Sequence, residues 1–194
     1  MKFFDVQQNS DEWVELRKGK FTCSIFGDLF MGKSTAGYRN AIYQVVFERL
    51  TGETPESFSG NWMERGKEFE AEGLEKYELM TFNKVSNGGF VELNEWIGGS
   101  PDGFVGKNLI ECKCPKYSTQ IDYLIEKKLP KIYEKQVQGQ LYVTSAKWCD
   151  FMCYHPKLKP LIIRVKRDEK MIKEIAEKLN ESIEKTKLII KQLS

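Results

Sequence analysis

A chain of 194 residues is long enough for one well-packed domain and short for two, so a single domain spanning residues 1–194 is expected. Its 30 basic and 28 acidic residues leave a formal charge of +2, which excludes the strong overall positive charge of many non-specific DNA binders. A nucleic-acid partner must therefore be held by a local patch. No apolar run approaches the roughly 18 residues of a membrane span. The polar, acidic start argues against an export signal, so a cytoplasmic protein with no membrane partner is expected.

Two short helices are predicted near the start of the chain. Ser10 or Asp11 can cap the first helix, and Gly19 is positioned to end it. The segment "FTCSIFGDLF" follows, in which Thr22 or Ser24 can cap a second short helix.

Longer helices are predicted next. The segment "YRNAIYQVVFERLTG" has the pattern of an amphipathic helix that ends at Gly52. Another helix is predicted over residues 60–80, and it contains Gly66 and Gly73. A glycine inside a helix costs about 1 kcal/mol relative to alanine, so these two indicate that another element packs close to that face.

The second half of the chain begins as a β-meander. From Lys84 to Pro115, short strand-like runs alternate with turns rich in glycine, proline and asparagine. A helix over "YEKQVQGQLYVTS" and two strands, "KWCDFMCYHP" and "PLIIRVKR", follow. The order of elements predicts an α+β fold with an α/β-type core, in which a central mixed β-sheet is flanked by helices.

The tail from Asp168 predicts a helix with one apolar stripe. The stripe consists of Ile172, Ala176, Leu179, Ile183, Thr186, Ile190 and Leu193. We interpret it as a core face, with a partner-binding helix as the alternative.

The cysteine pattern indicates buried free thiols. The five cysteines are Cys23, Cys112, Cys114, Cys149 and Cys153. An odd number argues against a disulfide framework, and the spacings are not those of zinc sites. Alternation places Cys149 and Cys153 on one face of a strand, as it does the two cysteines of "ECKC", where thiols behave as small hydrophobes. A metal cluster is the alternative.

The stretch "SPDGFVGKNLIECKCP", residues 100–115, places one acid in a turn, then an acid and a lysine on a short strand. Side chains alternate along a strand, so Glu111 and Lys113 share a face, beside the turn that holds Asp102. Two converging carboxylates need a cation between them, and hard oxygen ligands favour Mg²⁺, with Mn²⁺ as a substitute. The carbonyl of Cys112 is a further candidate ligand. Lys113 can orient an attacking water or stabilise charge on a phosphate.

These residues also have a plain structural interpretation. Glu-x-Lys is common on solvated strand edges, and Pro-Asp-Gly is a common hairpin turn.

Other candidate site residues lie elsewhere in the chain. Glu70, on the helix over residues 60–80, can bring a third carboxylate to the metal; a surface acid is the alternative. Arg17 and Ser24 lie near helix ends, where they can hold a phosphate; a salt bridge and a cap are the alternatives. The single histidine, His155, lies in the "YHPKLKP" turn and is expected at the surface.

Together these motifs resemble a known nuclease family. Asp102 followed by Glu111-x-Lys113 is similar to the PD-(D/E)xK nuclease signature. More specifically, the chain resembles the phage lambda exonuclease and YqaJ-type viral recombinase family, whose core is like that of restriction endonucleases. The matching segments occur in family order: "EWVELRKGKFTCS", "RGKEFEAEG", "GSPDGFV", "IECKCP", "YEKQVQGQLYVT", "KWCDFMCYHP" and "RVKRDEK". The segment "FMGKSTAGYRN" departs from the family where a DNA-facing loop is expected.

The resemblance implies roles for particular residues. Asp102 and Glu111 would be ligands of catalytic magnesium, assisted by the carbonyl of Cys112, and Lys113 the water-activating or transition-state lysine. Glu70 would be the helix carboxylate near a second metal. The positions that match the surroundings of the 5′-phosphate end of DNA are Arg17, Ser24, Ser100 and Gln136. Gln138 is interpreted either as a further contact or as exposed helix surface.

The resemblance also implies an activity and partners. It implies 5′→3′ digestion of one strand of duplex DNA from its ends in the bacterial host cell. The remaining 3′ single strand would pass to a separate annealing protein. Known members form a ring-shaped homotrimer that encircles DNA.

Two alternatives stay open. A DNA repair nuclease of the Cas4 or RecB type shares the two acids and the lysine, but usually adds four cysteines around an iron–sulfur cluster. A catalytically silent DNA-binding scaffold would usually have lost one of Asp102, Glu111 and Lys113, all of which are present here.

Overall fold

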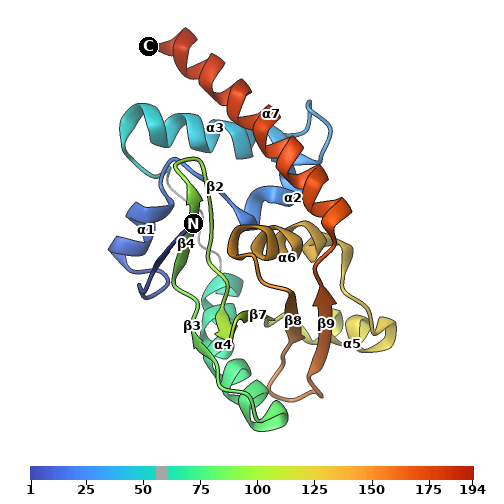
Figure 1. Ribbon diagram of the computed structural model, residues 1–194. Coiled ribbons are helices and arrows are strands. Elements are labelled where there is room, and N and C mark those ends of the chain that lie inside the picture. Colours follow the sequence, from blue (N-terminus) through green and yellow to red (C-terminus); the bar gives the residue numbers. More distant parts are fainter. Residues whose placement is uncertain (56–60) are drawn as a thin grey trace.

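The structure of the protein, a computed structural model, describes the backbone of residues 1–55 and 61–194 (Figure 1). Side chains are described for these residues except 61–68, so Gly66 lies outside the described side chains. The helices are α1 (Asp11–Arg17), α2 (Phe26–Leu29), α3 (Ala36–Thr51), α4 (Asn61–Thr81), α5 (Tyr117–Glu126), α6 (Lys131–Thr144) and α7 (Glu169–Leu193), with a 3₁₀ turn η1 (Cys23–Ile25). The strands are β1 (Lys2–Phe4), β2 (Phe21–Thr22), β3 (Ser86–Asn87), β4 (Phe90–Asn94), β5 (Ile97–Gly99), β6 (Gly103–Val105), β7 (Asn108–Lys113), β8 (Trp148–Cys153) and β9 (Leu161–Lys166).

The strands form two mixed sheets flanked by helices, which confirms the α+β class. One sheet has the order β1-β4-β5-β2, and the other has the order β3-β6-β7-β8-β9. The predicted meander is thus divided between two sheets instead of forming one. The chain leaves the larger sheet between β3 and β4 and returns to it at the turn between β5 and β6, which begins with Ser100 and holds Asp102.

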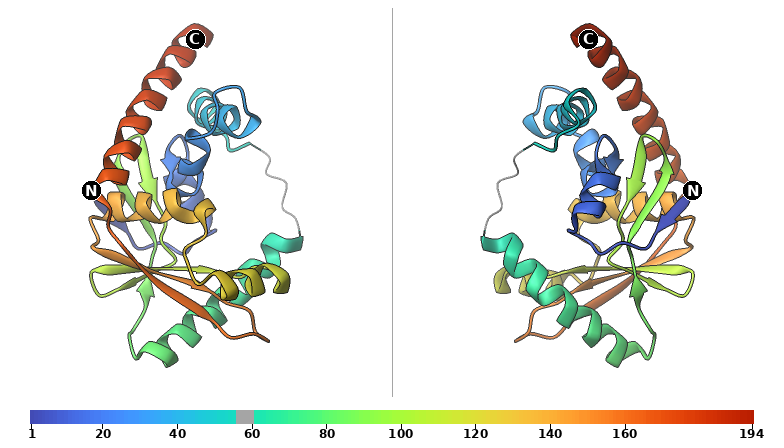
Figure 2. Two further views of the ribbon diagram at one scale, coloured as in Figure 1. Left: turned by 90° about the vertical axis from the view of Figure 1, so that its right-hand side faces the viewer. Right: turned by 90° about the vertical axis from the view of Figure 1, so that its left-hand side faces the viewer.

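The larger sheet has a parallel pair at its centre. Strands β7 and β8 run parallel, with Glu111 opposite Phe151 and Lys113 opposite Cys153. Parallel neighbours need a crossover connection, and here α5 and α6 supply it. This crossover brings α6 onto one face of the sheet (Figure 2).

The two faces of this sheet bury different side chains. The α6 face buries Leu109, Val137, Leu141, Cys149, Phe151 and Cys153. The opposite face, covered by α4, buries Tyr77, Ile110, Cys112, Met152 and Tyr154. All five cysteines are free thiols. The expected burial is confirmed for four of them, whereas Cys114 is half-buried.

The start and end signals of the helices are mostly where the sequence predicts them. The side chain of Ser10 caps α1, and Gly52 ends α3 in the left-handed conformation. Gly19 also has a positive φ, just after α1. Thr22 precedes η1 without a side-chain capping bond, and Ser24 lies inside that turn. Strand β1 and helix α5 are elements that the sequence pattern did not predict.

Helix α4 lies unusually close to the sheet. A Cβ atom at Gly73 would be 2.7 Å from Cys112 Sγ and 3.2 Å from Tyr154 Cβ. This contact explains the glycine. Further along α4, the hydroxyl of Tyr77 donates a 2.7 Å hydrogen bond to the buried carboxylate of Asp150. These two contacts fix α4 against β7 and β8.

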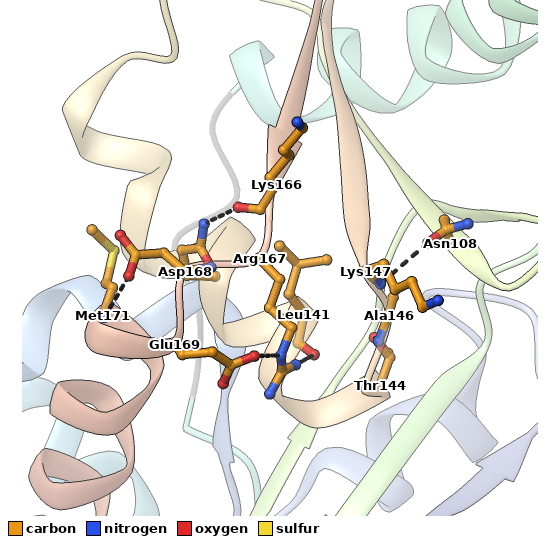
Figure 3. A network of polar contacts seen from close by, with 11 residues as sticks. Asn108, Leu141, Thr144, Ala146, Lys147, Lys166, Arg167, Asp168, Glu169 and Met171 are labelled. Atoms are coloured by element: carbon orange, nitrogen blue, oxygen red, sulfur yellow. Dashed lines mark hydrogen bonds and ion pairs between the residues drawn. The ribbon is translucent and has the colours of Figure 1, made fainter.

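Helix α7 is attached to α6 by a polar network (Figure 3). The side-chain amide of Gln138 donates to the carbonyl of Lys166 at 2.8 Å, and its oxygen accepts from the backbone N–H of Asp168 at 3.0 Å. Arg167 donates to the carbonyl of Leu141. Gln138 is therefore buried and structural, and its interpretation as exposed helix surface is wrong.

Most of the predicted stripe on α7 is a core face. Ile172, Leu179, Ile183 and Thr186 are buried, while Leu193 is 65% exposed. The stripe therefore packs against the body for most of its length. In Figure 2 the last turns of α7 extend past the rest of the chain.

Within the described part of the chain, no helix combines the length and apolar character needed to cross a membrane.

The close contact at Gly73 can be tested by substitution. We expect Gly73→Ala to lower the free energy of unfolding by about 1–3 kcal/mol, because the added methyl group overlaps Cys112 of β7 and crowds Tyr154, the residue after β8. Gly27→Ala in α2 is the matched control, since a Cβ there meets no heavy atom within 4 Å among the described residues. Urea denaturation measures both. Equal stabilities of the two variants would contradict the proximity of α4 to the sheet.

Candidate active site

Strand β7 carries the acid and the lysine of the ECK motif on its α6 face. Glu111 is fully buried and Lys113 is half-buried. The ammonium group of Lys113 forms an ion pair with Glu111 Oε1. The two-residue period of the strand therefore brings these side chains together as predicted.

Two glutamines of α6 complete the environment of the buried carboxylate. Gln136 Nε2 donates to Glu111 Oε1 at 2.5 Å, and Gln140 Nε2 donates to Glu111 Oε2 at 2.6 Å. A buried carboxylate is strongly unfavourable unless donors surround it, and these residues with Lys113 meet that requirement. The side-chain oxygen of Gln140 is buried and has no hydrogen-bond partner in the described part of the chain, so it is available to a water or a ligand.

Asp102 lies where the β6–β7 ladder ends. Gly103 pairs with Ile110, so the preceding residue lies beside Glu111. Asp102 Oδ2 accepts a 2.7 Å hydrogen bond from the backbone N–H of Cys112, which orients the carboxylate toward β7.

The pKa of Asp102 is raised well above its ordinary value. Burial is the largest cause, followed by the negative charge of Glu111, and Glu70 contributes in the same direction. Glu111 is therefore close enough to Asp102 to disfavour the ionised form of Asp102.

Lys113 is the cation nearest to this pair of acids in the described structure. Burial lowers its pKa, but the charges of Glu111 and Asp102 raise it by more, so the pKa lies above the ordinary value. A lysine in this state acts as a cation and hydrogen-bond donor, and is a poor general base at neutral pH.

The donor set suits a hard divalent cation. Asp102 and Glu111 offer carboxylate oxygens and Cys112 offers a backbone carbonyl, which are ligand types that magnesium accepts while it keeps several waters. Glu70, on α4 one turn before Gly73, is close enough to affect the pKa of Asp102. Across residues 1–55 and 69–194, however, no group of three or more His, Cys, Asp or Glu side chains is arranged to hold a metal ion.

A second cluster lies on the N-terminal side of Asp102 and is organised by Arg17. The guanidinium donates to Thr22 Oγ1 at 3.2 Å and makes a longer 3.4 Å contact with Ser100 Oγ. It stacks on the ring of Trp13 at 4.1 Å, and Trp13 Nε1 donates to Ser100 Oγ at 2.9 Å. Thr22 Oγ1 also lies 3.2 Å from the hydroxyl of Ser24. Arg17, Ser24 and Ser100 are thus brought together.

The charge of Arg17 is surrounded by hydroxyl groups and an aromatic ring. No carboxylate among the described side chains forms an ion pair with it. Its pKa is lowered, chiefly because burial disfavours the charged form, although Glu48 acts in the opposite direction. A half-buried guanidinium surrounded by hydroxyl groups is a site suited to an anion such as phosphate.

The predicted site residues therefore form two adjoining groups. Gln136, predicted near the 5′-phosphate, contacts Glu111. Gln140 links the groups, since its amide also lies 3.5 Å from the carbonyl of Ser100. Sequence reasoning missed Gln140, Trp13 and Thr22. The glutamine spacing of four along a helix was the available signal for Gln140.

Comparison with known proteins finds one matching family and several similar solved structures. Residues 12–147 match the model of the YqaJ-like viral recombinase domain. Among solved structures, LHK-Exo, an alkaline exonuclease from Laribacter hongkongensis, is 32% identical with a TM-score of 0.88, covering 95% of this chain and 96% of that chain. Its structure with dAMP gives 31% identity and a TM-score of 0.89, with the same 95% and 96% coverage.

A phage-related exonuclease from Haemophilus somnus is 20% identical with a TM-score of 0.72, over 92% of this chain and 98% of that chain, and shows likeness of fold alone. No curated protein matched the chain. The domain match extends over most of the chain and includes the Arg17 cluster, Asp102 and the ECK motif. The chain belongs to the YqaJ-like viral recombinase family.

Proposed function

We propose that this protein is a magnesium-dependent 5′→3′ exonuclease that digests double-stranded DNA in phage-type recombination and leaves 3′ single strands. The observation that carries the proposal is the pairing of two unlike sites. Asp102 and Glu111 form an acidic site that favours a cation, and Arg17 forms a cationic site that has no ion-paired acid among the described side chains. A divalent metal ion would compensate the negative charge of the acidic site, and the terminal phosphate of a DNA strand would compensate the positive charge of Arg17. The membership of a family with an exonuclease relative supports the same reading.

Each residue of the acidic site has a proposed role. Asp102, Glu111 and the carbonyl of Cys112 would hold Mg²⁺, for which Mn²⁺ can substitute, and Glu70 would reach a second position. The bound ion supplies Lewis acidity and neutralises charge on the scissile phosphate. Lys113 keeps its proton at Nζ and stabilises the negative charge that develops on the phosphate oxygens. Gln136 and Gln140 hold the Glu111 carboxylate in position.

The Arg17 cluster is proposed to select the end of the DNA strand. A terminal phosphate carries nearly two negative charges, whereas an internal phosphodiester carries one, so an unneutralised guanidinium favours the end. Ser24 and Ser100 would donate hydroxyl hydrogen bonds to the same phosphate. The relative LHK-Exo has been crystallised in complex with dAMP, which is consistent with a DNA substrate for this protein.

We further propose that residues 1–194 act as one nuclease domain on duplex DNA ends. A separate single-strand annealing protein would receive the product, and a homotrimer would keep the enzyme on its substrate. Both assignments come from the family resemblance.

The Cas4- or RecB-type alternative is less well supported by the arrangement of the cysteines. Cys112 faces α4, whereas Cys149 and Cys153 face α6 on the other side of the same sheet. Thiols separated by a sheet do not converge on one cluster. A catalytically silent scaffold is disfavoured because the acids and the lysine are not only present but assembled around one point.

Metal dependence and polarity can be measured in one assay. With linear duplex labelled at either end, we expect EDTA to abolish digestion and Mg²⁺ or Mn²⁺ to restore it, because the paired acids need a cation. We expect a label at the 5′ terminus to be released before one at the 3′ terminus. Digestion that continues in EDTA, or that begins at the 3′ terminus, would refute the proposed function.

The role of Lys113 is tested by Lys113→Ala. We expect cleavage to fall about 100-fold or more, because a cation beside the developing charge is lost. DNA binding in EDTA should remain measurable, since phosphate contacts elsewhere supply affinity. Lys107→Ala, in the exposed turn between β6 and β7, is the control and should cleave normally. Normal cleavage by the Lys113 variant would remove this residue from the mechanism.

The role of Arg17 is tested by comparing 5′-phosphorylated and 5′-hydroxyl duplexes. We expect the native protein to digest phosphorylated ends faster, and Arg17→Ala to reduce that preference, because a charge-assisted contact to phosphate is worth about 1.5–3 kcal/mol. Arg39→Ala, an exposed arginine on α3, should keep the ratio of the two rates unchanged. Equal rates on both ends with the native protein would argue against a phosphate pocket.

A further inference from the structure

The proposed mechanism does not use a pocket of about 710 Å³ whose wall includes Phe69, the residue before Glu70. It lies between the part of α4 around Phe69, helix α5 and the turn that joins β8 to β9. These segments lie near one another in Figure 2. Its lining includes Phe69, Tyr117, Ile121, His155, Lys157 and Leu158. We refer to it as the α5 pocket.

The α5 pocket exposes aromatic and aliphatic side chains. Tyr117 is 66% exposed and Ile121 is 42% exposed. His155 is only 7% exposed, so its predicted surface position is wrong. Its ring forms part of the pocket wall, and its Nδ1 accepts the backbone N–H of Lys157 at 3.2 Å, which shapes the turn. A concave surface with an exposed aromatic ring is suited to a flat ligand.

Three residues of the pocket wall lie near residues of the acidic site, in the chain or through a backbone hydrogen bond. Phe69 directly precedes Glu70, and Tyr117 follows Lys113 by one short turn of chain. The backbone N–H of Tyr154 donates to the carbonyl of Lys113 at 2.8 Å, and His155 is the next residue. A chain held at the metal ligands would therefore pass close to the pocket.

Helix α5 is held firmly against the β8–β9 turn. The side-chain amide of Gln120 is buried and donates to the carbonyls of Cys153 and Lys159, both at 3.1 Å. These bonds hold the two sides of the pocket together. The pocket is therefore a preformed feature of the fold.

Two of the three sides of the pocket, α5 with its flanking turns and the β8–β9 turn, are basic, whereas α4 carries Glu70, Glu72 and Glu75 next to Phe69. Residues 114–131 and 155–160 contain the lysines Lys116, Lys127, Lys128, Lys131, Lys157 and Lys159. The same segments contain only two acids, Asp122 and Glu126. The excess of four positive charges here exceeds the +2 of the whole chain. The side of the pocket formed by α5 and the β8–β9 turn is therefore complementary to a polyanion.

We propose that the α5 pocket binds unpaired nucleotides of single-stranded DNA, with a base stacked on Tyr117 and the backbone phosphates near Lys157 and Lys159. Aromatic stacking combined with a basic groove is how proteins hold single strands without sequence preference. A base inside a duplex is paired and stacked, so it cannot enter such a pocket without being extruded. The identity of the strand as DNA rests on the proposed function.

The test measures binding of a fluorescently labelled 5′-hydroxyl oligothymidylate to the full chain in EDTA, so that cleavage does not interfere. We expect Tyr117→Ala to weaken binding by about tenfold or more, because one base–aromatic stack is lost. Tyr117→Phe should bind like the native protein, since the ring remains. Lys157→Ala should weaken binding and reduce its salt dependence. Tyr43→Ala is the control, because Tyr43 is a 54% exposed tyrosine on α3, away from the pocket.

Unchanged binding by Tyr117→Ala, or an equal loss in the Tyr43 control, would overturn the proposal. Competition by blunt duplex as effective as by single strand would also overturn it. The outcome is separable from that of the proposed function. Binding that depends on Tyr117 in a protein without nuclease activity would retain the pocket and reject the enzyme. Metal-dependent digestion by the native protein, with unchanged binding by Tyr117→Ala, would retain the enzyme and reject the pocket.

Discussion

The burial of the Glu111 carboxylate is the constraint on which the rest of the site depends. A carboxylate at this position, within the centre of a sheet, is unfavourable unless donors reach both of its oxygens. Strand β7 supplies Lys113 two residues away, and α6 supplies Gln136 and Gln140 from the crossover that the parallel β7–β8 pair requires. The same topology that makes the sheet stable thus surrounds the acid with donors. The hydrogen bonds from Gln136 and Gln140 to Glu111 also fix the position of α6 relative to β7.

The site places a pair of acids close to an arginine that is not ion-paired with any described side chain. Burial, together with the negative charge of Glu111, raises the pKa of Asp102. Arg17, by contrast, is held by hydroxyl groups and the ring of Trp13, with no acid paired to it among the described side chains. Neither arrangement favours stability by itself, because each leaves charge uncompensated in a partly buried position. Such arrangements are typical of sites that a ligand completes, and a phosphate accompanied by a divalent cation has the required distribution of charge.

The two faces of the larger sheet contribute different residues to the candidate site. On one face, α6 carries the polar groups that contact Glu111, and on the other, α4 packs at Gly73 so closely that no side chain fits between helix and sheet. This close packing brings Glu70, one turn earlier, near Asp102, and brings Phe69 to the wall of the α5 pocket. A glycine that weakens the helix locally is therefore what allows α4 to contribute to both places.

Local features of the site could be predicted from the sequence, whereas contacts between distant segments could not. The two-residue period of a strand is enough to put Glu111 and Lys113 on one face, and capping residues were enough to locate α1 and the end of α3. The approach of Arg17 to Ser100, 83 residues away, and the capture of Glu111 by Gln136 and Gln140 from 25 and 29 residues away were decided by tertiary structure. The same is true of the division of the meander into two sheets, of α5, and of the burial of Gln138 and His155. Periodicity and capping act between neighbours in the chain, so the sequence determines them directly. Which donor meets which acid depends on how the crossover places α6 on the sheet, and that is a property of the whole packed fold.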